Sequence, residues 1–282
     1  MNNVKTTAAF VANLRYEDLP ETSVRAAKQC VLDWFAAAIG GSQETAARIL
    51  RETILPADGA TDASLFGTNR QRAAAMHAAF LNGAAVCAGE FAPRVPVIAA
   101  AASAFAAAEK ERRNGRELLT AIVAGCELAA RLGETETLSP DVSGGGAEMV
   151  AAASAARALG LSPEQTVHAL KLAEAQATGA ERSDGAATRL LRIGKACYEG
   201  VLSAYLANAG STGAAQAPDG ENNAAPDEPR IFPAASSWEE SRRRFLALSA
   251  PVVGEARASR LAAFAETLDE SEDVAASLRE LL

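Results

Sequence analysis

Alanine constrains this chain more than any other feature of its sequence. It occupies 68 of the 282 positions, whereas aromatic residues make up only 5%. Alanine is the strongest helix former because it loses no side-chain entropy when a helix forms. Its small side chain also lets neighbouring helices approach each other closely. We therefore predict an all-α fold, in which tightly packed helices form a single helical-bundle domain.

The spacing of apolar residues supports helices along most of the chain. Apolar side chains recur three and four residues apart over residues 21–39 and 115–132, as one buried helix face requires. Residues 162–165 (SPEQ) combine an N-cap serine, a proline at the first helical position and a glutamine placed for a capping box. Strand-type alternation is almost absent, apart from a short extended piece at residues 64–67.

One segment breaks this pattern. Residues 210–233 are rich in Gly, Ala, Asn, Asp and Pro, a composition typical of a flexible linker. Helical signals resume with a second capping pattern at residues 236–240 (SSWEE). We therefore predict a main helical part over 1–209, a linker over 210–235, and C-terminal helices over 236–282 that pack back on the main part.

Composition and charge exclude several classes of function. The net charge of −8 argues against a nucleic-acid partner, since phosphate binding needs clustered Lys and Arg. The alanine-rich run 98–108 is too short and too weakly hydrophobic to span a membrane. No secretory signal is recognisable at the start. The four cysteines (Cys30, Cys87, Cys126, Cys197) form no CxxC pair and have no histidine at metal-ligand spacing, so we expect no metal, no cofactor and a reducing cytoplasmic compartment.

An ordered series of motifs resembles one known family. Residues 81–93 (LNGAAVCAGEFAP) resemble the "NGxxxHxxDFDD" block of the MmgE/PrpD family, which includes 2-methylcitrate dehydratases, cis-aconitate decarboxylases and some epimerases. Residues 114–127, 151–161 and 194–213 are similar to three of its helices. The resemblance implies the family's helical domain and a homodimer formed through it. We also expect a homodimer from the alanine-rich helices and the absent lid.

The resemblance also implies a missing part. Family members commonly carry an α+β lid domain, inserted late in the chain before the sequence returns to the helical body. Residues 210–233 stand where this lid would be inserted, and residues 232–282 resemble the returning helices. We therefore expect a lidless helical domain, whose cleft is open to water or covered by a partner subunit.

The family's proton-transfer residues are largely replaced. Cys87 stands in place of a histidine, and Glu90 is the one acidic residue kept from the DFDD block. Arg189 and Arg192 replace a lysine and a histidine. A further family histidine falls nearest to Asp141 or Ser143 in a glycine-rich segment, so those two residues remain alternatives.

Arginine cannot replace histidine as a proton shuttle, because guanidinium effectively never loses its proton. Two arginines one helical turn apart could instead hold a carboxylate bidentately. The alternative is that both are ordinary surface residues. Ser143 and Arg94 are further candidates for substrate binding. Gly144, Gly145 and Gly146 either offer backbone N–H groups to an anion or form a flexible loop.

Cys87 and Glu90 share one helical face if their helix persists through Gly89. Cys87 is then a candidate nucleophile or weak acid, and Glu90 a general base if desolvation raises its pKa. The alternatives are a packed cysteine and a glutamate at a helix end. His77 and His168 are expected to be structural or surface residues.

Two hypotheses of function follow. The first is a divergent lyase or isomerase for a small carboxylate-containing metabolite of a specialised biosynthetic pathway. In it Arg189 and Arg192 bind the anion, and Glu90 with Cys87 or Asp141 moves the proton. The second is a non-catalytic scaffold or partner subunit that kept the helical fold after losing the histidines and the lid.

Overall fold

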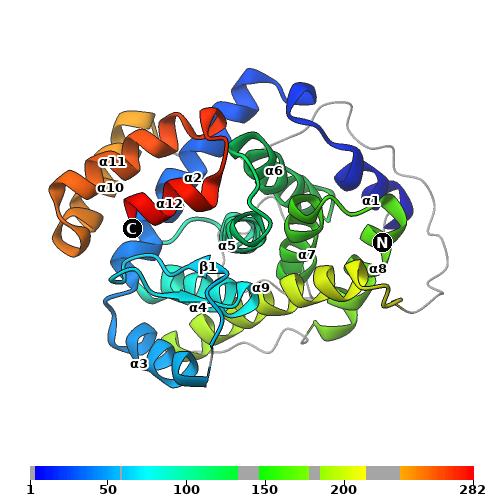
Figure 1. Ribbon diagram of the computed structural model, residues 1–282, viewed down its shortest axis with the longest axis horizontal. Helices are drawn as coiled ribbons and strands as arrows, with labels where there is room; N and C mark the ends of the chain where they lie inside the picture. Colours follow the sequence, from blue (N-terminus) through cyan, green and yellow to red (C-terminus); the bar gives the residue numbers. More distant parts are fainter. Residues whose placement is uncertain (1–3, 58, 133–145, 178–184, 214–235) are drawn as a thin grey trace.

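The computed structural model describes residues 4–57, 59–132, 146–177, 185–213 and 236–282, and this part of the chain is predominantly helical (Figure 1). A two-stranded antiparallel hairpin, with Ala63 opposite Ala73, accompanies the helices. The all-α prediction is confirmed. The elements are α1 (Val4–Asn13), α2 (Glu21–Gly41), α3 (Thr45–Ile54), β1 (Ala63–Ser64), β2 (Arg72–Ala73), α4 (Ala75–Ala88), α5 (Val95–Lys110), α6 (Gly115–Arg131), α7 (Gly146–Leu159), α8 (Pro163–Gln176), α9 (Ala186–Asn208), α10 (Trp238–Val253), α11 (Glu255–Glu266) and α12 (Val274–Leu281).

Helix α5 forms the centre of the molecule. Figure 1 shows it nearly end-on, with α2, α4, α6 and α7 around it. Every residue from Val95 to Glu109 is buried, because alanines cover the faces of this helix and leave no polar stripe for water. None of the described helices combines the length and the hydropathy that crossing a bilayer requires.

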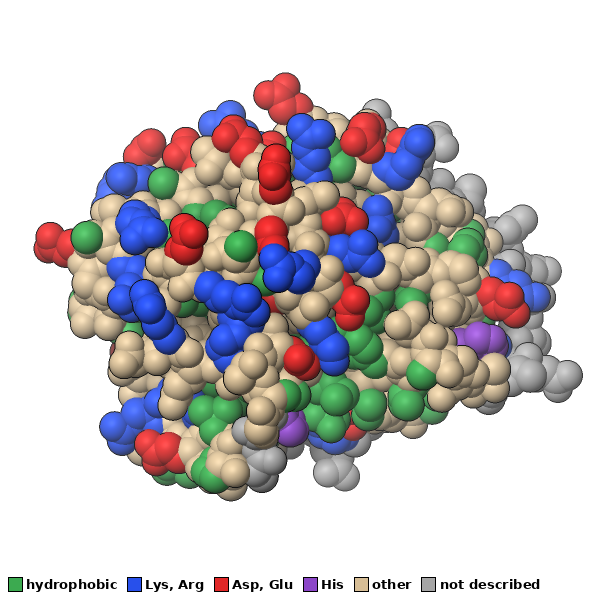
Figure 2. Space-filling model, viewed as in Figure 1, with side chains coloured by type: hydrophobic (Ala, Val, Ile, Leu, Met, Phe, Trp, Pro, Cys, Tyr) green, Lys and Arg blue, Asp and Glu red, His purple; other side chains and the backbone are tan. Residues whose placement is uncertain are grey.

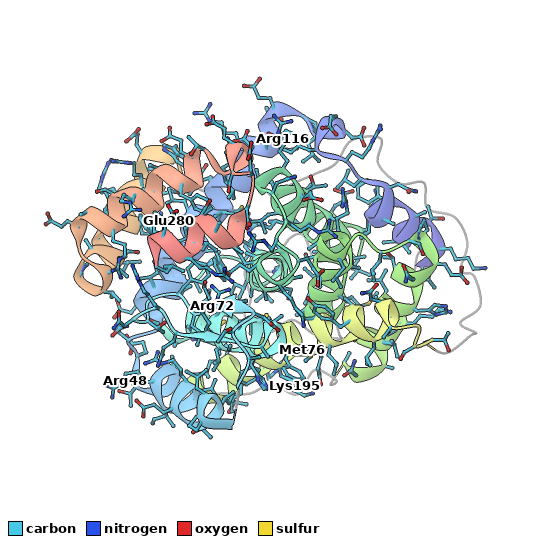
Figure 3. All side chains as sticks on the ribbon, in the orientation of Figure 1. Arg48, Arg72, Met76, Arg116, Lys195 and Glu280 are labelled. Atoms are coloured by element: carbon cyan, nitrogen blue, oxygen red, sulfur yellow. The ribbon has the colours of Figure 1, made fainter. Side chains whose placement is uncertain are left out.

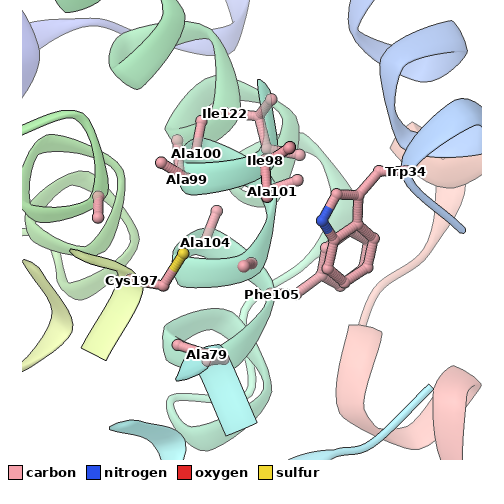
Figure 4. Packing of buried hydrophobic residues seen from close by; sticks show 14 of the residues in the cluster. Trp34, Ala79, Ile98, Ala99, Ala100, Ala101, Ala104, Phe105, Ile122 and Cys197 are labelled. Carbon is pink, nitrogen blue, oxygen red and sulfur yellow. The ribbon is translucent and has the colours of Figure 1, made fainter. Parts of the chain in front are cut away.

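Four of the chain's few aromatic side chains pack between α2, α5 and the hairpin. The Trp34 and Phe105 rings are stacked with their centroids 5.2 Å apart, as Figure 4 shows, and Phe66 meets Trp34 edge-on at 4.9 Å. Phe35 completes the group, 5.1 Å from Phe66. Aromatic pairs of this geometry contribute about 0.5–1.5 kcal/mol each beyond their buried area. This cluster anchors one side of α5, while alanine contacts surround the other.

Helices α4, α7 and α9 are held together at small residues. A Cβ added to Gly200 of α9 would lie 2.3 Å from the Cβ of Ala151 on α7. A Cβ added to Gly83 of α4 would lie 2.7 Å from the sulfur of Cys197 on α9. Larger side chains at these points would force the helices apart. The close approach brings the end of α4, the start of α7 and the first half of α9 to one place.

Two buried polar side chains hold the hairpin to this body. Asn82 of α4 accepts a hydrogen bond from the Phe66 N–H (3.1 Å) and donates one to the Ser64 carbonyl (2.9 Å). Glu109 of α5 accepts hydrogen bonds from the Ser64 N–H (2.9 Å) and hydroxyl (2.7 Å), and pairs with Arg72 at 3.0 Å. Asn82, a residue that the sequence shares with the family pattern, therefore has a structural role: it holds the hairpin to α4.

Helices α10, α11 and α12 lie against α2 and α5, as the orange and red segments of Figure 1 show. The ion pair Arg244–Asp33 (2.9 Å) joins α10 to α2, and Lys28–Asp269 (2.5 Å) joins α2 to the turn after α11. Residues 214–235 lie outside the described part of the chain. The division into a main part, a linker and returning C-terminal helices therefore stays a prediction.

Candidate active site

The segment after α4 departs from the expected helix. Helix α4 ends at Ala88, and Gly89 is extended (φ −84°, ψ 175°). Any residue can adopt this extended conformation, and Pro93, four residues further on, could not be accommodated inside a continuing helix. The expectation that Cys87 and Glu90 share a helical face is therefore wrong: Cys87 lies on the last turn and Glu90 on the following loop.

Cys87 is packed inside the protein. Only 5% of it is exposed. Burial raises the pKa of its thiol to about 12, and the positive charge of Arg189 opposes this increase only in part. The thiol is therefore neutral near pH 7, whereas the thiolate is the nucleophilic form of cysteine.

Glu90 and Arg94 occupy different surroundings from Cys87. Glu90 is exposed and forms no hydrogen bond or ion pair with any residue that the structure describes, so its position lacks the desolvation that a general base needs. Arg94 is half-buried, and its positive charge lowers the pKa of the Cys30 thiol in α2, against the larger effect of burial. Phe91 of the same loop packs under the guanidinium of Arg244, 4.4 Å away. This loop thus faces α2 and α10.

Arg189 and Arg192 lie one turn apart near the start of α9, and both are half-buried. The positive charge of Arg189 lowers the pKa of the Cys87 thiol at the end of α4, against the larger effect of burial. The positive charge of Arg192 lowers the pKa of the Glu148 carboxyl group in the first turn of α7, against the larger effect of burial. The two arginines therefore stand where α4, α7 and α9 meet. We call this place the α4–α7–α9 junction.

Three charged residues of this junction were not foreseen in the sequence: Glu148, Lys195 and Glu199. Figure 3 labels Lys195 on α9 and Met76 on the neighbouring helix α4. The Lys195 ammonium lies 3.0 Å from a carboxylate oxygen of Glu199. Glu148 is only 8% exposed, and burial raises its pKa. The available signal was a glutamate at the start of an alanine-rich helix, α7, whose only other charged residue is Arg157 at the far end.

The structure does not describe some of the other candidates. Asp141, Ser143, Gly144 and Gly145 fall outside the described residues. His77 stacks on Tyr198, with ring centroids 5.6 Å apart. Within the described ranges, no three His, Cys, Asp or Glu side chains are grouped as metal ligands. On the face shown in Figure 2, acidic and basic side chains are interspersed rather than separated into patches of one sign.

Comparison with known proteins supports the sequence resemblance. Residues 5–225 match the model of the MmgE/PrpD N-terminal domain, which covers most of the chain. No curated protein gave a significant match. The matched range contains α2 to α9 and all of α1 except its first residue, and therefore all three helices of the α4–α7–α9 junction. On this evidence the chain belongs to the MmgE/PrpD family, through a helical domain of the N-terminal type.

Proposed function

We propose that this protein is a divergent lyase or isomerase for a small carboxylate-containing metabolite, which binds at the α4–α7–α9 junction. The observation that carries the proposal is the pair Arg189 and Arg192. Both are half-buried and lie one turn apart on α9. The charge of Arg189 lowers the pKa of Cys87 on α4, and the charge of Arg192 lowers the pKa of Glu148 on α7. A partly desolvated guanidinium pair suits a carboxylate, which it holds through bidentate, charge-assisted hydrogen bonds.

Such a reaction also needs a group that moves a proton. In the proposal Cys87 acts as a neutral packing partner or hydrogen-bond donor and not as a nucleophile, because its pKa is about 12. Glu90 can serve as a base only if bound substrate or a second subunit removes it from water. Asp141 and Ser143 remain proposed members of the site through the resemblance.

One observation favours the alternative of a non-catalytic scaffold or partner subunit. Asn82 and Gly83, which match the family pattern, are explained by hydrogen bonds to the hairpin and by close packing on Cys197. The fold alone therefore explains why Asn82 and Gly83 are present, without a catalytic role for either residue. In this alternative the arginines are a binding or surface feature only.

Calorimetric titration with succinate and with citrate tests the proposal. We expect binding to the wild-type protein, weakened about 10- to 100-fold by Arg189→Gln or Arg192→Gln, since each removes hydrogen bonds between charged groups. Arg242→Gln is the control, because Arg242 is an exposed arginine of α10. Absence of binding, or equal weakening by the control, would contradict the proposed site.

Solvent exchange separates the two functions. In D2O, an enzyme of this class exchanges a carbon-bound proton next to the carboxylate of its substrate, which NMR detects as loss of the proton signal. The scaffold alternative predicts binding without exchange for every carboxylate that binds. A set of di- and tricarboxylates chosen by the calorimetric titration provides the substrates for this assay.

We also propose that the protein is a cytoplasmic homodimer, as the resemblance and the alanine-rich helices imply. Multi-angle light scattering measures this directly. The proposal predicts twice the chain mass of 29.1 kDa. A mass equal to that of one chain at micromolar concentration would refute it.

A further inference from the structure

Arg244 of α10 contacts two other parts of the chain at once. One of its guanidinium nitrogens lies 2.9 Å from a carboxylate oxygen of Asp33 on α2. The centre of the same guanidinium lies 4.4 Å from the centre of the Phe91 ring. Phe91 belongs to residues 89–94, which join α4 to α5 and which we call the α4–α5 loop. One side chain therefore joins three segments that are far apart in the sequence.

Both contacts of Arg244 are partly shielded from water. The Arg244 side chain is 31% exposed, and that of Asp33 only 13%. Phe91 is half-buried and packs against the core. Ion pairs and contacts between a cation and an aromatic face are weak in water and strengthen as water is removed. The surroundings of Arg244 therefore favour both contacts.

Helix α10 gives Arg244 a fixed base. Gln29 of α2 donates hydrogen bonds to the Ser236 carbonyl (2.5 Å) and to the Ser241 hydroxyl (3.0 Å), at the start of α10. Phe245, the residue after Arg244, is fully buried. Since α10 is attached to α2 on both sides of the arginine, the guanidinium cannot follow a loop that moves away.

The α4–α5 loop has few attachments of its own. Gly89 packs on the end of α2, where an added Cβ would lie 3.5 Å from the Cα of Gly41. Residues 89–93 form no hydrogen bond with any residue that the structure describes. The neighbours of Phe91 on either side are exposed. Within the described part of the chain, the contact with Arg244 is therefore the one polar attachment of the middle of this loop.

We propose that Arg244 is a clamp, through which the C-terminal helices hold the α4–α5 loop in place and keep Glu90 in water. Asp33 fixes the guanidinium, and the guanidinium fixes the Phe91 ring. While the clamp is closed, Glu90 stays exposed; when it opens, the loop is free to turn Glu90 elsewhere. The inference does not depend on the proposed function, because it concerns the position of the loop and requires no ligand.

Local proteolysis tests the clamp. A glutamate-specific protease cuts after Glu90 only when the loop detaches, so the rate of this cut measures how often the loop is open. Mass spectrometry identifies the cut, and each rate is divided by that of a synthetic peptide of residues 86–97 with the same sequence. Arg244→Met removes the charge but keeps an unbranched side chain over Phe91. We expect it to speed the cut about 5- to 30-fold.

Further variants show whether the charge of Arg244 acts through the ring. Arg244→Lys should restore most of the protection, since an ammonium group can serve both Asp33 and the ring. Phe91→Leu should also speed the cut, and the double variant Arg244→Met/Phe91→Leu should be cut no faster than the faster single variant, because both changes break one clamp. Arg243→Met is the matched control, an exposed arginine of the same helix, whose cut should stay within about twofold of wild type.

Cleavage after Glu164, an exposed glutamate of α8, is followed in the same digests as a measure of general unfolding. Equal cutting after Glu90 in wild type and Arg244→Met overturns the clamp. So does absence of rescue by lysine, multiplication of the two effects in the double variant, or an equal rise of the cut after Glu164. If circular dichroism shows Arg244→Met to be unfolded, Phe91→Leu decides, because it leaves the ion pair with Asp33 in place; unchanged protection there also overturns the clamp.

Discussion

Replacement of Asn82 by alanine tests whether this shared residue serves the fold. Its side chain satisfies the Phe66 N–H and the Ser64 carbonyl, both in a buried setting. Each buried polar group left unpaired costs about 1–3 kcal/mol. A water-sized cavity lined by Asn82 and Leu81 adjoins the site, so one water can replace part of what is lost. We expect Asn82→Ala to lower the free energy of unfolding by about 2–4 kcal/mol.

Thermal unfolding followed by circular dichroism measures this change. For a chain of this size we expect Tm to fall by about 5–10 °C. Gln43→Ala is the control, because Gln43 donates to the Gly67 carbonyl of the same loop from an exposed position where water can replace it. Its effect should stay below about 1 kcal/mol. An Asn82→Ala protein as stable as wild type would refute the structural role of Asn82.

Three further predictions concern packing and charge. Gly200→Val should destabilise the fold by about 1–3 kcal/mol or more, since its Cβ would lie 2.3 Å from Ala151, whereas Gly59→Ala, in open space, should change stability by less than about 0.5 kcal/mol in urea unfolding. All four thiols are buried, so a thiol reagent should label the native protein slowly and completely only after unfolding; rapid labelling of the native protein would contradict the packing. The folded-state pKa of Glu148 is raised above its ordinary value of 4.5, so its contribution to stability is fully present below about pH 4.5 and is lost as pH rises through the raised pKa. Glu148→Gln should therefore gain stability relative to wild type between pH 4 and pH 7 in denaturant titrations, and a constant difference would contradict the raised pKa.

The sequence was sufficient for features that depend on local chemistry. The Ser162 hydroxyl accepts a hydrogen bond from the Gln165 N–H (3.2 Å), and Ser237 caps α10 in the same way, as the capping patterns predict. The alanine run at 98–108 could be excluded as a membrane span, and its place at the centre of the core follows from its lack of a polar face. These features involve residues close together in the chain.

Features that depend on residues far apart in the chain were harder to predict from the sequence. The helix that carries Cys87 does not persist through Gly89, which is extended, and it begins only at Ala75 because Arg72 and Ala73 pair with β1. The hairpin depends on Glu109, which is far away in sequence. Glu148 is distinguished by its burial, and burial is a property of the assembled helices α7 and α9. The arginines were found through the resemblance, and Asp141 and Ser143 lie outside the described residues.

A crystal structure of the protein with bound citrate would test the central claim most directly, namely that an anion site lies where α4, α7 and α9 meet. The account predicts a citrate carboxylate within hydrogen-bonding distance of the guanidinium groups of Arg189 and Arg192. Citrate bound only at the loop that carries Glu90 and Arg94, with Arg189 and Arg192 unoccupied, would contradict it.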